Sequence, residues 1–150
     1  MKRVLFVCLG NICRSPLGEG ILRRMAADRG IEIEVDSAGT GDYHIGDLPD
    51  PRARAEGERR GYDMSMRARQ VTPSDFKDFE LIIAMDEANV SNLMKIPGAD
   101  KSKIFLARSF DPTATTAHVA DPYYGTEDDF KEVADQLEAA CEKILDKIEP

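Results

Sequence analysis

The segment from Val4 to Pro16 constrains the fold of this chain more than any other segment does. It begins with four consecutive apolar residues, Val4 to Val7, a run that is typical of a strand buried on both faces of a parallel sheet. Ser15 and Pro16 are typical of a helix start, because serine is a good N-cap and proline needs no partner for an N–H there. The sequence therefore predicts a strand, a short loop and a helix in direct succession.

The loop between this strand and this helix is suited to bind an anion, and it begins with a nucleophile. Gly10 and Asn11 tolerate positive φ, so successive backbone N–H groups can turn toward one point beside the helix N-terminus. Arg14 can add a two-pronged contact to phosphate oxygens. The same field favours thiolate over thiol at Cys8, and Ser15 can donate a hydrogen bond to the sulfur. We interpret the loop as a phosphate site with Cys8 as its nucleophile; the alternative is that Cys8 is a small core residue.

Strands alternate with helices along the whole chain, without repeats or linkers. Strands are expected at 2–7, 31–37, 79–85 and 103–107, and helices at 16–29, 51–61, from 72 as a short turn, at 86–97 and at 127–148. Parallel strands joined by right-handed crossovers predict an α/β fold. We expect one domain over residues 1–150, a three-layer α/β/α structure whose four-stranded parallel sheet is doubly wound. Its phosphate-binding loop would follow strand 1, at the carboxyl edge of the sheet, where Cys8 lies.

Charge and hydropathy exclude several classes of protein. A formal net charge of −8 argues against binding to nucleic acid or to anionic membranes. No stretch is long and apolar enough to span a bilayer, and the run from Val4 to Val7 is too short for a signal peptide. Three cysteines in a chain that we expect to be intracellular do not indicate a disulfide framework. We expect a cytoplasmic monomer that binds neither nucleic acid nor membranes.

Five short segments along the chain form a recognisable set: Cys8-Leu9-Gly10-Asn11-Ile12-Cys13-Arg14-Ser15-Pro16, Asp36-Ser37-Ala38-Gly39-Thr40, Ala68-Arg69-Gln70, Met85-Asp86 and Asp121-Pro122-Tyr123-Tyr124-Gly125. Together they resemble the signature and the other motifs of the low-molecular-weight protein tyrosine phosphatases, and they extend over essentially the whole chain. The resemblance implies hydrolysis of phosphomonoesters, with phosphotyrosine-containing proteins as substrates and inorganic phosphate as a product. It also implies a phosphocysteine intermediate, no metal ion and no cofactor.

The resemblance also implies roles for individual residues. Cys8 would be the nucleophile, Arg14 the phosphate ligand, and Asp121 the general acid. Without the resemblance, Asp121 is typical of a solvated turn, although the chemistry needs a group that protonates the leaving oxygen. The same carboxyl group could then activate water. We expect the substrate site to be formed by Leu9, Gly10, Asn11, Ile12, Cys13, Ser15, Tyr43 and Tyr124.

Two aromatic positions predict the shape of the substrate site. Tyr43 falls where the family carries an aromatic wall beside the phosphate loop. Tyr124, or the neighbouring Tyr123, could form the opposite wall of a slot that fits a flat phenyl ring. A slot as deep as a phenyl ring would admit phosphotyrosine, whereas the shorter side chain of phosphoserine would hold its phosphate too far from Cys8.

Several residues keep two interpretations. Cys13 could protect the nucleophile by forming a disulfide with it, or it could only fill a packing position. Ser37 could orient the loop through Asn11, or it could belong to a plain turn. Asp86 fits a helix cap better than a catalytic group. Met66 departs from the family, because some members carry a histidine there that helps to hold the loop.

Two other functions fit parts of the pattern. Arsenate reduction reuses the same kind of loop, but it needs further cysteines near the central strand, and residues 79–99 contain none. A non-catalytic anion sensor would not need both the nucleophile Cys8 and the acid Asp121. Within the phosphatase interpretation, the sequence leaves phosphoarginine open as a substrate beside phosphotyrosine.

Overall fold

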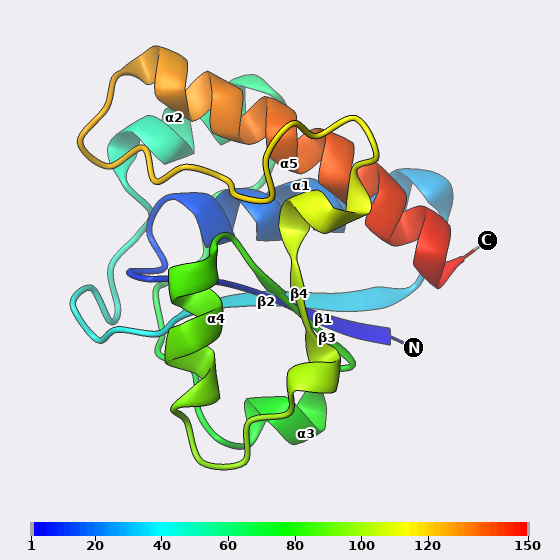
Figure 1. Ribbon diagram of the computed structural model, residues 1–150. Helices are drawn as coiled ribbons and strands as arrows, with labels where there is room; N and C mark the ends of the chain where they lie inside the picture. The colour runs from blue at the N-terminus through cyan, green and yellow to red at the C-terminus, as the bar shows by residue number, and fades with distance from the viewer. Residues whose placement is uncertain (1, 150) are drawn as a thin grey trace.

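The computed structural model describes residues 2–149, and four strands in it form one parallel sheet (Figure 1). The strands are β1 (Lys2–Cys8), β2 (Ile33–Gly39), β3 (Leu81–Ala84) and β4 (Ile104–Leu106). Their order in the sheet is β2-β1-β3-β4, and every pair of neighbours is parallel. The predicted α/β fold with a four-stranded parallel sheet is confirmed.

Strand β1 lies in the interior of the sheet, as its apolar sequence predicts. Val4 to Val7 are fully buried, because β1 lies between β2 and β3 and an apolar cluster covers each of its two faces. The chain first builds outward from β1 to β2 and then crosses to β3 on the opposite side. The order of strands therefore reverses between β1 and β3, and the crevice at their carboxyl ends is where open α/β sheets bind ligands. Cys8 is the last residue of β1 and lies at this edge.

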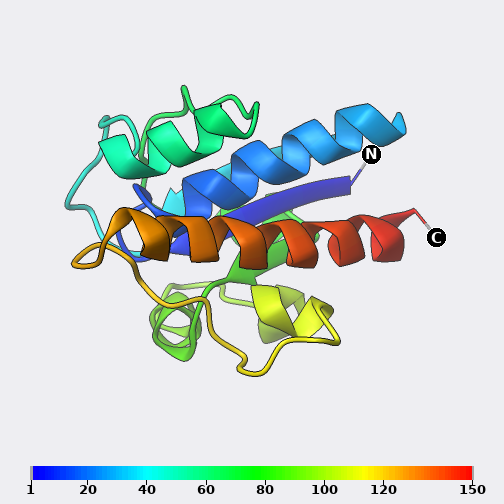
Figure 2. The ribbon, with the colours of Figure 1, turned by 90° about the horizontal axis from the view of Figure 1, so that it is seen from above.

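Within residues 2–149, five helices cover the two faces of the sheet: α1 (Arg14–Arg29), α2 (Pro51–Arg59), α3 (Asp75–Asp78), α4 (Glu87–Met94) and α5 (Glu127–Ile148). Helices α1 and α5 pack side by side over one face, with α2 beside them, while α3 and α4 cover the other face (Figures 1 and 2). Two short 3₁₀ turns, η1 (Lys101–Lys103) and η2 (Ala107–Phe110), flank β4.

Each face of the sheet has its own apolar core. On the α1 and α5 side, Phe6 of β1 packs with Leu17 of α1 and with Phe130 of α5. On the other side, Leu5 and Val7 of β1 belong to a second cluster with residues of β3 and α4. Alternate residues of β1 thus face opposite layers, which gives the predicted three-layer α/β/α arrangement. No helix within residues 2–149 has both the length and the apolar character needed to cross a bilayer.

The start of α1 differs from the prediction. The helix begins at Arg14 rather than at Pro16, and its N-cap residue is Cys13, whose side chain makes no capping hydrogen bond. Ser15 is therefore inside the first turn, and its hydroxyl lies against Cys8 instead of capping the helix. The sequence pattern was correct about the element and wrong about Ser15 as its N-cap, because tertiary contact with β1 overrides the local capping preference. The predicted contact between the Ser15 hydroxyl and the Cys8 sulfur is present. The other predicted elements are confirmed, with ends that differ by a few residues.

Candidate active site

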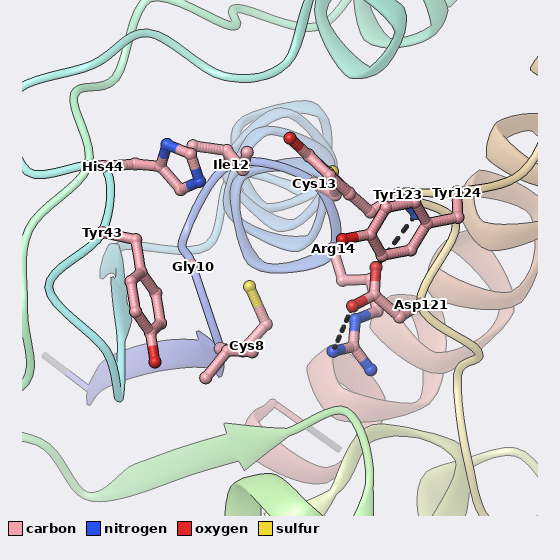
Figure 3. Close-up of a pocket in the computed structure, with 11 residues that line it drawn as sticks. Cys8, Gly10, Ile12, Cys13, Arg14, Tyr43, His44, Asp121, Tyr123 and Tyr124 are labelled. Carbon is pink, nitrogen blue, oxygen red and sulfur yellow. Dashed lines mark hydrogen bonds and ion pairs between the residues drawn. The ribbon is translucent and has the colours of Figure 1, made fainter.

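A cavity of about 350 Å³ opens at the carboxyl end of β1, beside the N-terminus of α1 (Figure 3). The residues that line it are Cys8, Leu9, Gly10, Ile12, Cys13, Arg14, Tyr43, His44, Asp121, Tyr123 and Tyr124. The structure thus brings most of the predicted site residues together from three separate parts of the chain. Asn11 and Ser15 do not line the cavity, because both side chains are buried. The segment Cys8 to Arg14 is called the anion loop below.

The sulfur of Cys8 lies within hydrogen-bond distance of a hydroxyl group. Cys8 is only 3% exposed, and its Sγ lies 3.0 Å from Ser15 Oγ. Asn11 Nδ2 donates to the same Ser15 oxygen over 2.8 Å, so the hydroxyl hydrogen of Ser15 remains available for the sulfur. Ser15 is therefore placed to donate to Cys8 and to stabilise negative charge on it.

Asn11 fixes the shape of the anion loop from behind. Its φ of 57° is in the left-handed region, which asparagine tolerates better than most residues. Its Nδ2 donates to Ser37 Oγ over 3.0 Å as well as to Ser15, and its Oδ1 accepts from the backbone N–H of Arg69 over 3.0 Å. Ser37 therefore does orient the loop through Asn11, the first of its two predicted interpretations.

The loop support continues into the core through Ser37. Ser37 Oγ donates to Glu19 Oε1 over 2.6 Å, and Arg23 pairs with the other oxygen of Glu19 at 2.6 Å. Glu19 is 3% exposed, and this burial raises the pKa of Glu19 despite its hydrogen bonds. Met66, which stands where some family members have histidine, packs against the apolar core instead. The loop is held here through Ser37, Glu19 and the backbone at Arg69.

Glycine is required where the anion loop meets the end of β2. A Cβ atom on Gly39 would lie 2.7 Å from the carbonyl oxygen of Leu9 and 3.2 Å from the backbone nitrogen of Asn11. The backbone N–H of Thr40 donates to the carbonyl of Cys8 over 3.0 Å, and that of Gly41 donates to the carbonyl of Leu9 over 2.9 Å. The close approach of the two chains therefore sets the path of the loop.

Arg14 is buried and held by fixed acceptors. It is 3% exposed; its Nη1 donates to Asp86 Oδ2 over 2.6 Å and to the carbonyl of Val119 over 2.9 Å. Its Nη2 lies 3.7 Å from Asp121 Oδ2 (Figure 3). These contacts orient a permanently charged guanidinium at the edge of the cavity.

Asp86 caps α4, as predicted, and it has a second contact that sequence reasoning missed. Its Oδ1 accepts from the N–H of Asn89 over 2.9 Å, while its Oδ2 accepts from Arg14. Partial burial alone would raise the pKa of Asp86, but the hydrogen bonds from Arg14 and Asn89 hold it below its ordinary value. The carboxylate of Asp86 therefore caps α4 and also orients the guanidinium of Arg14.

The side chain of Asp121 lies at the opening of the cavity. It is 48% exposed and belongs to the long segment between η2 and α5. Its Oδ1 accepts from the backbone N–H of Tyr123 over 3.1 Å, and its carboxyl group points toward Arg14 (Figure 3). Water and a bound ligand can both reach this carboxyl group.

Aromatic side chains flank the cavity on two sides. Tyr43 lies on one side, and Tyr123 and Tyr124 lie on the other, as the predicted slot requires (Figure 3). Tyr43 is 71% exposed and Tyr124 is 97% exposed, while Tyr123 packs edge-to-face on Tyr124 at 4.9 Å between ring centroids. His44 also lines the cavity and was not predicted; its place next to Tyr43 was the one signal in the sequence.

Cys13 is a free, buried thiol at the N-terminus of α1. Burial, together with the negative charge of Asp50, raises the pKa of Cys13, so this thiol stays protonated near neutral pH. Both interpretations of Cys13, a protective disulfide with Cys8 and a plain packing position, stay predictions.

The contact between Asp86 and Arg14 predicts a pH-dependent contribution to stability. We expect Asp86→Asn to lower the free energy of unfolding at pH 7 by about 1 kcal/mol or more, because a hydrogen bond to a charged group is lost. Since the pKa of Asp86 is lowered in the folded state, its contribution is complete above the unfolded-state pKa and is lost as the pH falls through the folded-state pKa. Urea denaturation of both proteins should therefore show a gap at pH 7 that narrows below about pH 4.

A matched variant controls for charge alone. Asp28→Asn removes an exposed partner of Arg24 on α1 and should change stability little at either pH. A gap between wild type and Asp86→Asn that stays constant from neutral to acid pH would contradict the assigned sign.

Comparisons with known proteins agree with the resemblance noted in the sequence. Residues 3–150 match the family described as low molecular weight phosphotyrosine protein phosphatase. The human protein of that name is 43% identical over 97% of this chain and 95% of its own length. A crystal structure of a protein tyrosine phosphatase from Entamoeba histolytica superposes with a TM-score of 0.94, at 43% identity over 99% of this chain and 97% of that chain. A structure named as the drosophila arginine phosphatase has a TM-score of 0.90 at 30% identity, over 100% of this chain and 99% of that chain.

Proposed function

The chain belongs to the low molecular weight phosphotyrosine protein phosphatases, and we propose that it hydrolyses phosphotyrosine in proteins through a phosphocysteine intermediate on Cys8, without a metal ion. The observation that supports this mechanism is the cavity that Cys8, Arg14 and Asp121 line together. A nucleophile, a fixed cation and a proton donor are the three groups that phosphoryl transfer to a thiol requires.

The anion loop binds the phosphoryl group. Its backbone N–H groups adjoin the N-terminus of α1, where the partial positive charge of the helix favours an anion. Arg14 supplies a full positive charge and two parallel donors for two phosphate oxygens. The phenyl ring of the substrate lies between Tyr43 and Tyr124, which suits a flat aromatic group.

In the first chemical step, Cys8 Sγ attacks phosphorus in line with the tyrosyl oxygen. A P–S bond forms as the P–O bond breaks, and Asp121 gives its proton to the leaving oxygen. Arg14 stabilises the charge on the equatorial phosphate oxygens. Ser15 stabilises the sulfur through the contact of 3.0 Å.

In the second step, water attacks the phosphocysteine. Asp121 is now a carboxylate and accepts a proton from the water as the new P–O bond forms. The P–S bond breaks, inorganic phosphate leaves, and the Cys8 thiolate and protonated Asp121 are restored. The half-exposed position of Asp121 supports this role, because water can approach it from the open side of the cavity.

Hydrolysis in the presence of a chelator tests the proposal directly. We expect release of nitrophenol from p-nitrophenyl phosphate, and of phosphate from a phosphotyrosyl peptide, at an unchanged rate with excess EDTA. Rapid quenching followed by mass spectrometry should find one phosphoryl group on the peptide that contains Cys8. Loss of activity in EDTA, or a phosphoryl group on another residue, would contradict the mechanism.

Phosphoarginine is a second candidate substrate, because one structural relative is named as an arginine phosphatase. Among the residues that line the described cavity, Asp121 alone has a carboxylate for a guanidinium, whereas three tyrosines and Leu9 offer apolar surface. This lining favours a phenyl ring. A comparison of kcat/KM for peptides that carry phosphotyrosine or phosphoarginine decides between the two substrates.

Arsenate reduction has less support than phosphate hydrolysis. Cys8 and Cys13 line the cavity, but Cys141 is fully buried in α5 near the carbonyl of Gly18. No third thiol lies at the cavity to continue a relay of oxidation, within the part of the chain that the structure describes.

A further inference from the structure

Arg52, in the first turn of α2, contacts the segment that carries Asp121. Its Nη2 donates to the carbonyl of Tyr123 over 2.8 Å, and its Nη1 donates to the carbonyl of Gly125 over 3.2 Å. Tyr123 is also the residue whose backbone N–H donates to Asp121 Oδ1. Tyr123 therefore links the two residues: its carbonyl accepts from Arg52, and its N–H donates to the carboxyl group of Asp121.

The guanidinium of Arg52 is itself clamped by Asp50. Arg52 Nε lies 3.0 Å from Asp50 Oδ1 and Arg52 Nη2 lies 3.0 Å from Asp50 Oδ2, which is a two-pronged pair. Asp50 also accepts from the backbone N–H of Arg52 and so caps α2. These hydrogen bonds lower the pKa of Asp50, so its carboxylate stays charged near neutral pH.

Asp50 connects this pair to the anion loop. Its backbone N–H donates to the carbonyl of Ile12 over 2.8 Å, and Ile12 lines the cavity. One face of the Arg52 guanidinium lies over the ring of Phe130, with 4.6 Å from Cζ to the centroid. Phe130 is 1% exposed and belongs to the core of α5. Arg52 therefore contacts three parts of the molecule: Asp50, which is bonded to the anion loop, Phe130 in the core, and the segment that carries Asp121.

From these contacts we infer that Arg52 is a positioning residue for the reaction: it holds the Asp121 segment at a fixed place over the anion loop. The inference rests on the proposed function, in which Asp121 is the general acid. Arg52 does not line the cavity and acts through Tyr123 and Asp50. Proton transfer to the leaving oxygen depends on the distance and direction of the donor, so a loosened segment weakens it.

Substrates with different leaving groups separate this role from a merely structural one. Phenyl phosphate has a poor leaving group that needs a proton, whereas 2,4-dinitrophenyl phosphate leaves readily without one. We expect Arg52→Ala to lower kcat/KM about 10-fold for phenyl phosphate and less than about 2-fold for 2,4-dinitrophenyl phosphate. Asp121→Asn should show the same pattern with a larger loss of about 100-fold for phenyl phosphate.

Two further variants make the comparison strict. Arg52→Lys keeps the positive charge but cannot donate to Asp50 and to two carbonyl groups together. It should therefore give an intermediate loss of kcat/KM, again larger for phenyl phosphate than for 2,4-dinitrophenyl phosphate. If Arg52→Ala does not fold, Arg52→Lys provides the test in its place. Arg54→Ala removes an arginine of the same helix that pairs with Glu58 at 3.8 Å, on α2 itself, and it should leave kcat/KM unchanged for both substrates. Vanadate inhibition should stay within about 2-fold of wild type in both Arg52 variants, because the anion loop is intact.

The outcomes are distinguishable. Suppose that Asp121→Asn is selective but the Arg52 variants lose kcat/KM equally on both substrates, or do not lose it at all. That result would overturn this inference and leave the proposed function standing. If Asp121→Asn is not selective either, the acid role of Asp121 is wrong and the inference fails with it.

Discussion

Replacing Cys8 with serine should lower kcat by at least about 10⁴-fold, which corresponds to about 5.5 kcal/mol of transition-state stabilisation. An alcohol ionises far less readily than a thiol, so the new side chain needs a base. The hydroxyl of Ser15, which lies 3.0 Å from the Cys8 sulfur, donates rather than accepts at this place, so it is not such a base. Hydrolysis of p-nitrophenyl phosphate, followed for hours at high enzyme concentration, measures the loss.

Binding should survive this substitution. The backbone N–H groups of the anion loop and the buried Arg14 are unchanged, so we expect the affinity for inorganic phosphate to stay within about 3-fold of wild type. The variant should also retain phosphotyrosyl proteins from a mixture, because it binds them without turning them over. Loss of phosphate binding together with activity would point to a damaged loop rather than to a missing nucleophile.

The same atomic change elsewhere in the chain provides the control. Cys141 is fully buried in α5, lies outside the cavity and is 4.0 Å from the carbonyl of Gly18. Cys141→Ser should keep kcat within about 2-fold of wild type, whatever its effect on stability. If instead Cys8→Ser retained a tenth or more of the wild-type rate, covalent catalysis by Cys8 would be excluded.

The sequence predicted the parts of the fold that local patterns encode. The apolar run from Val4 to Val7 marks a strand buried on both faces, and Asp50-Pro51 and Asp86 mark helix starts that the structure confirms. Each of these signals depends on residues that are only a few positions apart in the sequence. The position of the anion loop at the carboxyl edge of the sheet followed from the topology of alternating strands and helices.

Contacts between distant segments could not be predicted in this way. Asp86 and Arg14 are 72 positions apart, and Arg52 and Tyr123 are 71 positions apart, so nothing in the local sequence pairs them. The N-cap role predicted for Ser15 was wrong for a related reason. Its capping preference is local, whereas its contact with Cys8, which the loop pattern did predict, comes from the packing of β1 against α1. The sequence therefore predicted most of the residues that line the cavity and missed most of the contacts that orient them.

Arg14→Lys should give the second largest loss, because the family reaction places negative charge on oxygens that only a planar, two-pronged cation can match. We expect kcat to fall by about 100- to 1,000-fold. A lysine keeps the positive charge, but one ammonium group cannot donate to Asp86, to the carbonyl of Val119 and to two phosphate oxygens in fixed directions. The loss should therefore fall mainly on kcat, with a smaller rise in KM.

Two anions of the same charge class distinguish transition-state from ground-state binding. Vanadate can adopt the five-coordinate geometry of the transition state, whereas phosphate resembles the product. The inhibition constant of Arg14→Lys should rise at least about 10-fold more for vanadate than for phosphate. Arg24→Lys is the matched control on the same helix, since Arg24 is half exposed and reaches Asp28 and the carbonyl of Gly61 outside the cavity. Equal weakening of both anions with an unchanged kcat would mean that Arg14 only attracts the substrate, and the stabilisation of charge would then have to come from the backbone N–H groups of the anion loop alone.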